Sequence, residues 1–203
     1  MPPHVYLIRH GETAWSLSGR HTGRTEVPLT ERGERIAGRL KERLAAAAFS
    51  HVFISPRQRA ARTCELAGWG ASAVVVPDLS EWDYGDYEGL RSADVHETRP
   101  GWNLFRDGCP GGESPAEVSA RADRLIAYLR MLEGTVALFS HGHFGRAVAA
   151  RWTELPVVDG QRFLFDPCAL GILGYEKEDP AAPVISLWNE VPLEPSNAPS
   201  AGS

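Results

Sequence analysis

Two short apolar segments of this chain lead directly to a histidine that is followed by a glycine. Residues 5–8 run into Arg9 and His10, and residues 136–139 run through one serine into His141. Continuous apolar runs of this length predict buried strands. In an open α/β sheet, ligands bind just beyond the carboxyl ends of the strands. We therefore expect both imidazoles to lie in one crevice at that edge of the sheet.

A third apolar run, residues 52–54, is followed by Ser55 and Pro56. Serine is a favoured N-cap and proline suits the first helical position, so a helix is expected to begin there. Arg59 then lies in the first turns of that helix, near the same edge of the sheet. Two histidines and two arginines around helix starts are typical of a phosphate-binding pocket. The alternative is a set of solvated side chains at strand ends, with no ligand.

Strand and helix patterns alternate along the rest of the chain. Further strands are expected at residues 74–76, 170–175 and 184–188, the last two as a hairpin at the edge of the sheet. Helices are expected after Thr30, with Ile36, Leu40 and Leu44 on its apolar face, after Ser114, which begins a capping box, and after Gly142. Such alternation predicts an α/β fold, a three-layer α/β/α sandwich with a mainly parallel central sheet.

The segments between these elements are expected to be irregular. Residues 11–29 and the acidic, aromatic residues 78–90 are interpreted as loops, and residues 91–113 as a lid over the sheet edge. Residues 1–191 are predicted to form a single domain. From Pro192 onward small and polar residues dominate, so residues 192–203 are predicted to be a disordered tail.

Composition limits the partners of the chain. Its 203 residues carry 21 basic and 26 acidic side chains, a net charge of -5. This charge disfavours binding to nucleic acid or to a membrane surface, both of which favour a basic face. Three widely spaced cysteines, Cys64, Cys109 and Cys168, suggest reduced thiols in a cytoplasmic protein. No long apolar stretch stands near the first residue, so neither a signal peptide nor a membrane span is expected.

Six sequence blocks carry a resemblance to a known family. In chain order they are Arg9-His10-Gly11-Glu12-Thr13, His21-Thr22-Gly23 with residues 28–33, residues 55–60 with Thr63, residues 81–89, Gly111-Gly112-Glu113-Ser114, and Ser140-His141-Gly142-His143. In content and order they resemble the histidine phosphatase superfamily, which includes cofactor-dependent phosphoglycerate mutases. The resemblance covers roughly residues 4 to 190 and implies a phosphoglycerate mutase-like fold.

The resemblance also implies catalytic roles. His10 would be the nucleophile that becomes phosphohistidine, while Arg9, Arg59 and His141 would bind the phosphoryl oxygens. The arginines and a protonated His141 are expected to keep His10 neutral by lowering its pKa. For proton transfer, the acidic loop offers four carboxyl groups, among which composition cannot choose: Glu81, Asp83, Asp86 and Glu88. The resemblance selects Glu81, and the neighbouring Trp82 is expected to raise its pKa.

Two other kinds of site compete with this interpretation. His10, His141 and His143, with Glu81 nearby, could be zinc ligands, but arginines crowding a dication are unfavourable. A non-catalytic module that binds phosphate or phosphoproteins would keep the arginines without needing His10. We expect no metal and no other cofactor. The expected partner is a small phosphorylated substrate, and a dimer is possible.

The family contains both mutases and phosphatases. Mutases have asparagine where this chain has Ser16, and they carry a longer lid with an adjacent arginine pair. Here Arg91, Arg99 and Arg106 are isolated, which favours hydrolysis over a mutase reaction. Closer resemblance favours a phosphatase branch that includes acid phosphatases and sedoheptulose-1,7-bisphosphatase-type enzymes. Candidate residues around the leaving group are Ser16, Thr22, Gly23, Trp82, Tyr84, Trp102, Arg106, Gly142 and His143.

Overall fold

The computed structural model describes residues 2–192, which contain one six-stranded sheet. Its strands are β1 (His4–Arg9), β2 (Phe49–Ile54), β3 (Ala73–Val75), β4 (Thr135–Ser140), β5 (Leu170–Tyr175) and β6 (Pro183–Glu190), in the spatial order β3-β2-β4-β1-β5-β6. Strands β1 to β4 pair in parallel, whereas β5 runs antiparallel to both β1 and β6. The predicted mainly parallel sheet with a hairpin at its edge is confirmed.

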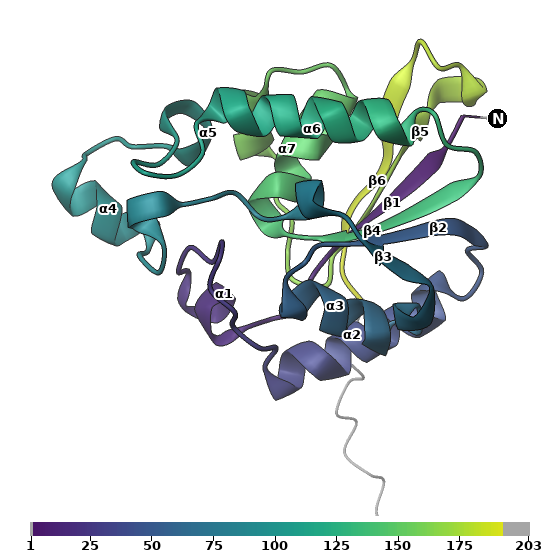
Figure 1. The fold of residues 1–203 in the computed structure, drawn as a ribbon, viewed down its shortest axis with the longest axis horizontal. Coiled ribbons are helices and arrows are strands. Elements are labelled where there is room, and N and C mark those ends of the chain that lie inside the picture. Colours follow the sequence, from purple (N-terminus) through teal and green to yellow (C-terminus); the bar gives the residue numbers. More distant parts are fainter. Residues whose placement is uncertain (1, 193–203) are drawn as a thin grey trace, which may run out of the picture.

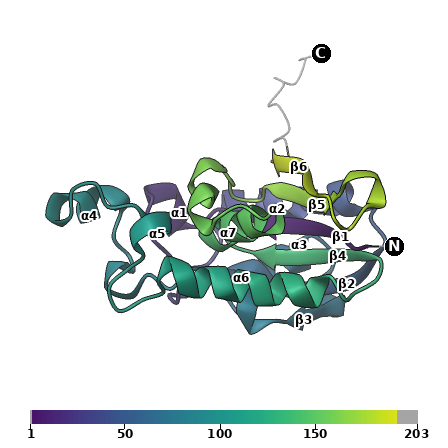
Figure 2. The same cartoon turned by 90° about the horizontal axis from the view of Figure 1, so that it is seen from above.

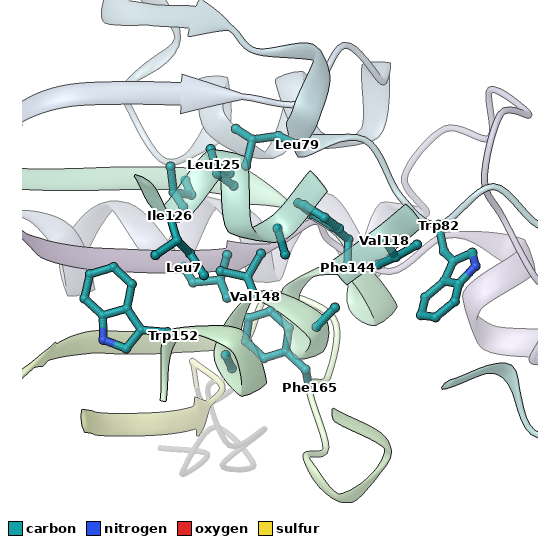
Figure 3. Packing of buried hydrophobic residues seen from close by; sticks show 14 of the residues in the cluster. Leu7, Leu79, Trp82, Val118, Leu125, Ile126, Phe144, Val148, Trp152 and Phe165 are labelled. Atoms are coloured by element: carbon teal, nitrogen blue, oxygen red, sulfur yellow. The ribbon is translucent and has the colours of Figure 1, made fainter. Parts of the chain in front are cut away.

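Helices cover both faces of this sheet (Figure 1). Helices α2 (Glu31–Leu44) and α3 (Gln58–Leu66) lie on one face, and α6 (Pro115–Leu129) and α7 (Gly142–Trp152) lie on the other. Side chains of a strand alternate between the faces. Accordingly, Leu7 packs into the cluster formed with α6 and α7, whereas Ile8 packs into the cluster formed with α2 and α3. Figure 3 shows Leu7 beside Ile126 and Val148. The predicted three-layer sandwich is confirmed.

Two of the predicted helix starts are confirmed atom by atom. The Thr30 hydroxyl accepts from the backbone N–H of Gly33 and begins α2. Ser114 and Glu117 form the reciprocal capping box of α6, with proline at the first helical position. These contacts satisfy N–H groups that have no partner within the helix, and so they fix where each helix begins.

The predicted start of the third helix is wrong. Helix α3 begins at Gln58 with Arg57 as its N-cap, and Ser55 lies two residues further upstream. The Ser55 hydroxyl lies 2.7 Å from Nε2 of His141 instead, so it is engaged at the sheet edge. Ser55, Pro56 and Arg57 therefore lie between β2 and α3, whereas Ser55 as the N-cap would start the helix at Pro56.

Three short helices stand in segments that the sequence predicts as irregular. They are α1 (Ala14–Ser18), α4 (Ser92–Thr98) and α5 (Leu104–Asp107). Helices of four to seven residues are too short to show a clear hydrophobic period, which explains why the pattern misses them. They lie together at one end of the molecule, beyond the sheet (Figures 1 and 2). Single 3₁₀ turns complete the described chain at Gly70–Ser72, Pro77–Leu79, Gly85–Tyr87, Val157–Arg162 (η4) and Glu176–Glu178.

Part of the predicted domain organisation lies outside the described residues. Residues 193–203 of the predicted tail fall there, and the single domain over residues 1–191 stays a prediction. Within residues 2–192, no helix is both long and apolar enough to cross a membrane.

Candidate active site

The two His-Gly segments meet because β1 and β4 are neighbours in the sheet. Arg9 is opposite Ser140 in the parallel register, so both strands end at the same level. The backbone N–H of His10 donates to the carbonyl of Ser140 at 3.0 Å. The imidazole rings of His10 and His141 then lie edge to face, with ring centroids 5.2 Å apart. The two histidines therefore lie side by side, as the sequence predicts, although His141 is fully buried.

The tautomer of His10 follows from its hydrogen bond. Nδ1 lies 2.7 Å from the carbonyl oxygen of Gly11, an atom that can only accept, so Nδ1 carries a proton. Burial, and then the nearby cations of Arg59 and Arg9, lower the pKa of His10 well below its usual value. The ring is therefore neutral, and Nε2 keeps a free lone pair. His10 thus has the protonation state that a nucleophile needs.

Three nitrogen atoms around His10 are buried without a hydrogen-bond partner among the described residues: Nε of Arg9, Nε of Arg59 and Nδ1 of His141. Other nitrogens of the two guanidinium groups are engaged. Arg59 donates to the carbonyls of Thr22, Gly23 and Thr25, and Arg9 donates to the carbonyl of Phe165. These contacts hold the two cations in place. Buried donors without partners are costly, and a phosphoryl oxygen would satisfy them.

His141 differs from its predicted state. Burial, followed by the cation of Arg59, lowers the pKa of His141 well below its usual value, which favours a neutral imidazole over the protonated one expected from the sequence. The sequence interpretation also missed the partner of this ring. The hydroxyl of the fully buried Ser55 lies 2.7 Å from Nε2 and fixes the orientation of the imidazole. The sequence does contain a signal for this role, because Ser55 directly follows β2, the strand next to β4. The same serine was interpreted as a helix cap instead.

Glu81 lies at the N-terminus of α7. Its Oε1 accepts from the backbone N–H groups of Phe144 at 2.7 Å and Trp82 at 2.9 Å, and its Oε2 accepts from the N–H of His143 at 3.1 Å. A helix N-terminus presents unpaired N–H groups and the positive end of the helix dipole, so it suits a carboxylate. Of the four carboxyl groups in the acidic loop, only Glu81 lines the cavity described next.

A cavity of about 250 Å³ lies over these groups. Eight of the predicted site residues line it, and they are Arg9, His10, Ser16, Thr22, Glu81, Tyr84, Gly142 and His143. Two further candidates, Arg59 and His141, are buried beneath its floor with their side chains beside His10. Gly23 adjoins the site through its carbonyl, which accepts from Arg59. The structure therefore brings most of the predicted site together.

Three predicted leaving-group residues do not reach this cavity. Trp82 is fully buried, with its indole N–H donating to the carbonyl of Glu113. Trp102 is buried beside a neighbouring cavity. Arg106 is exposed and bonds to Asp107 and to the carbonyl of Gly101, so it folds back on its own helix. Arg106 was a candidate through the resemblance to the phosphatase branch, and the structure places its side chain away from the cavity.

Two arginines that the sequence did not single out, Arg20 and Arg146, line the cavity, and Arg146 also lines its neighbour. Arg146 stands on α7 three residues after His143, and residues three apart share one face of a helix. The spacing of three residues from His143 is the sequence signal for Arg146, which lies beyond the last block of the resemblance.

The zinc alternative finds no support in residues 2–192, where no group of three or more histidine, cysteine, aspartate or glutamate side chains could hold a metal ion. The imidazoles that it required have other partners. Nδ1 of His143 contacts the hydroxyl of Tyr84, and Nε2 of His141 contacts Ser55.

Sequence comparison identifies the class of protein that this fold and site belong to. The family model of the histidine phosphatase superfamily (branch 1) matches residues 5–190, which is most of the chain. The chain therefore belongs to this superfamily, and the prediction of a phosphatase enzyme is confirmed at the level of the class.

Individual relatives narrow the comparison. An acid phosphatase of Mycobacterium tuberculosis is 46% identical over 177 residues, which cover 85% of this chain and 86% of the relative. A sedoheptulose 1,7-bisphosphatase of Saccharomyces cerevisiae is 31% identical over 92% of this chain and 93% of its own. The solved structure of a Mycobacterium tuberculosis open reading frame superposes with a TM-score of 0.87, at 41% identity, over 93% of this chain and 97% of that chain.

Proposed function

We propose that this protein hydrolyses phosphomonoesters of small metabolites through a phosphohistidine intermediate on Nε2 of His10. The observation that carries the proposal is the hydrogen bond from Nδ1 of His10 to the carbonyl of Gly11, at 2.7 Å. It directs the lone pair of a neutral imidazole to Nε2, next to the unpartnered donors of two arginines and a second histidine. A nucleophile and preorganised donors for the charge of the transferring group are what phosphoryl transfer requires.

The reaction has two steps. In the first, Nε2 of His10 attacks phosphorus, the bond from phosphorus to the ester oxygen breaks, and the leaving oxygen takes a proton from the Glu81 carboxyl group. In the second, water attacks phosphorus, the phosphorus–nitrogen bond breaks, and Glu81 takes the proton of the water as inorganic phosphate forms. Oε2 of Glu81 accepts one N–H, whereas Oε1 accepts two, so Oε2 is the oxygen with the freer lone pairs.

The phosphoryl group is held by charge and by geometry. Arg9 and Arg59 provide permanent cations, and Nδ1 of His141 has no hydrogen-bond partner among the described residues while Ser55 holds Nε2. Gly142 follows His141 and lies against the guanidinium of Arg9. Because glycine has no side chain there, the ligand can approach both His141 and Arg9 closely. These contacts strengthen as charge redistributes on the phosphoryl oxygens.

Hydrolysis is favoured over a mutase reaction by what surrounds the cavity. The Ser16 hydroxyl is engaged with the backbone of Thr13 in the cap of α1. Arg91 and Arg106 of the lid are each paired with an aspartate, Asp94 and Asp107. In the described part of the lid, no adjacent arginine pair is present to retain a phosphorylated product. Water is therefore the expected acceptor of the phosphoryl group.

Trapping the intermediate tests this proposal. Wild-type protein incubated with a radiolabelled phosphomonoester and quenched in alkali is expected to carry an acid-labile, alkali-stable label, as phosphohistidine does. His10→Ala should lose both label and turnover, while His4→Ala, which changes an exposed histidine of the same strand, should keep both. Label that persists in His10→Ala would refute the proposal. Isomerisation of 3-phosphoglycerate, primed with 2,3-bisphosphoglycerate, that outpaces phosphate release would favour the mutase alternative.

A further inference from the structure

A second cavity, of about 230 Å³, adjoins the first. The two have four lining residues in common, which are His21, Ser92, His143 and Arg146. The remaining wall of the second cavity comes from α4, α5 and η4. No carboxylate lies among the described residues that line it, whereas Glu81 lines the first cavity. A substrate bound at His10 therefore has a polar, acid-free space next to its leaving group.

Arg146 is the cation at the boundary between the two cavities. Its Nε donates to the carbonyl of Gly160 at 2.9 Å and its Nη2 donates to the carbonyl of Gln161 at 2.7 Å. The guanidinium also lies over the ring of Phe105, 4.7 Å from the centroid. These three contacts fix the group without neutralising it, because none involves a carboxylate. Glu81 lies near enough to interact with Arg146 by charge, but no carboxylate is hydrogen-bonded to the guanidinium, which therefore remains suited to an oxyanion.

His143 adds a neutral donor at the same boundary. Its Nδ1 lies 2.6 Å from the hydroxyl of Tyr84. Burial raises the pKa of Tyr84 well above its usual value, so the hydroxyl keeps its proton and donates it to Nδ1. Burial, and then Arg146, lower the pKa of His143, so the ring holds a single proton, which this hydrogen bond leaves on Nε2. Tyr84 is thus a positioning residue that makes His143 an N–H donor.

The second cavity is less suited to an aromatic leaving group. Its indole, Trp102, is only 5% exposed, and its N–H donates to the carbonyl of Gly108. The rings of His21, Tyr87 and His96 pack around it, at centroid distances of 5.5, 5.3 and 6.3 Å. An aromatic leaving group such as a nucleobase could stack on Trp102 only if a face of the indole were open, and the neighbouring rings already cover it.

We propose that the second cavity is a subsite for an oxyanionic group, either a carboxylate or a second phosphoryl group, carried by the leaving group of the substrate, with Arg146 as its counter-ion. The proposal rests on the proposed function, because it needs a phosphomonoester bound at His10. Substrates with such a group are then preferred over matched neutral substrates. A charge-assisted hydrogen bond to the distal group corresponds to about ten- to hundredfold in kcat/KM.

Matched substrate pairs test the subsite. Glycerol 3-phosphate and 3-phosphoglycerate differ in a carboxylate, and fructose 6-phosphate and fructose 1,6-bisphosphate differ in a phosphoryl group. The quantity measured is the ratio of kcat/KM within each pair, which cancels changes in the common chemistry. Wild-type protein should prefer the anionic member of at least one pair by about tenfold or more. The pair that shows the preference identifies the distal group.

Three variants identify the residue responsible. Arg146→Gln should bring the preferred ratio close to one. Arg106→Gln, which removes an exposed arginine already paired with Asp107, should leave the ratio unchanged. Gln161→Glu should lower the ratio, because it places a carboxylate on the wall of the subsite. This variant tests the subsite even if Arg146→Gln does not fold.

Two outcomes would overturn the subsite: wild-type ratios near or below one for both pairs, or an unchanged ratio in Arg146→Gln and Gln161→Glu. Absence of phosphate release from every substrate, including 4-nitrophenyl phosphate, would instead contradict the proposed function, so the two failures are distinguishable.

Discussion

At the scale of single residues, each of the two central histidines is held through one ring nitrogen so that the other remains available, whereas Glu81 accepts N–H groups at both oxygens. Gly11 holds Nδ1 of His10, Ser55 holds Nε2 of His141, and backbone N–H groups hold Glu81. Only part of this arrangement could be predicted from the sequence. Strand ends placed His10 and His141, but a hydroxyl such as Ser55 serves equally well as a helix cap, and composition gave no reason to choose Glu81 over its acidic neighbours.

Replacing Glu81 by glutamine tests its proposed role in proton transfer. Glu81→Gln keeps the shape of the side chain but cannot donate a proton to the leaving oxygen. We expect kcat/KM for alkyl and sugar phosphates to fall by about 10²–10³-fold, and that for 4-nitrophenyl phosphate, whose leaving group needs no proton, to fall by less than about tenfold. Glu97→Gln, at an exposed position of α4, serves as the control. Equal losses for both substrate classes would exclude general acid catalysis by Glu81.

At the scale of elements, the first turn of α2 packs closely on the loop that follows His10, the proposed nucleophile. A Cβ atom at Gly33 would lie 2.3 Å from the carbonyl oxygen of Glu12, and one at Gly11 would lie 2.9 Å from the carbonyl oxygen of Gly33. Real Cβ atoms do not approach backbone so closely, so glycine at both positions brings helix and loop together. The sequence predicted α2 from its period and its cap, but this backbone contact leaves no periodic signal.

Two glycines of the same helix give a matched pair of variants. Gly33→Ala should push α2 away from the loop, lower the free energy of unfolding by about 1–3 kcal/mol and reduce kcat/KM. Gly38→Ala meets no atom within 4 Å and should raise the free energy of unfolding by about 0.5–1 kcal/mol, through helix propensity, without changing kcat/KM. Urea unfolding and steady-state kinetics measure both effects. A stable, fully active Gly33→Ala would show that the contact is dispensable.

At the scale of the whole molecule, the strand order β2-β4-β1 brings three chain segments to one edge of the sheet. The alternation of elements was enough to predict the layers and the mainly parallel sheet, because it depends on hydrophobic period alone. The lid could not be predicted in the same way, since its helices are short and their positions depend on tertiary contacts. The cytoplasmic location and a dimer remain predictions.

Burial of three histidines in this site makes the stability of the fold depend on pH. His10, His141 and His143 all have pKa values lowered by burial, while in the unfolded chain they titrate near the usual value of 6.5. Below that pH the unfolded state binds more protons than the folded state, so stability falls as pH falls. Between about pH 7.5 and 5.5 the loss is about 4 kcal/mol as an upper bound for three groups.

Urea unfolding midpoints across this pH range measure the loss. His10→Gln should make the midpoint less dependent on pH, because it removes one of the buried histidines, which also include His21. Asp94 changes the stability only below this pH range. Arg91 lowers the pKa of Asp94 to about 2, so the stabilisation by the ionised carboxylate is complete above the usual carboxyl pKa and is lost as the pH falls towards 2. A midpoint that does not change between these pH values would contradict the assignment.

The contact between Glu81 and α7 bears on how such an enzyme can change its substrate over evolution. Glu81 is held by the backbone N–H groups of His143 and Phe144, which every amino acid except proline supplies. The side chain of His143, by contrast, faces both cavities. One position therefore joins a backbone contact that does not depend on its side chain to a side chain that lines both cavities. A substitution there can change the lining of both cavities while the backbone N–H still holds the Glu81 carboxylate.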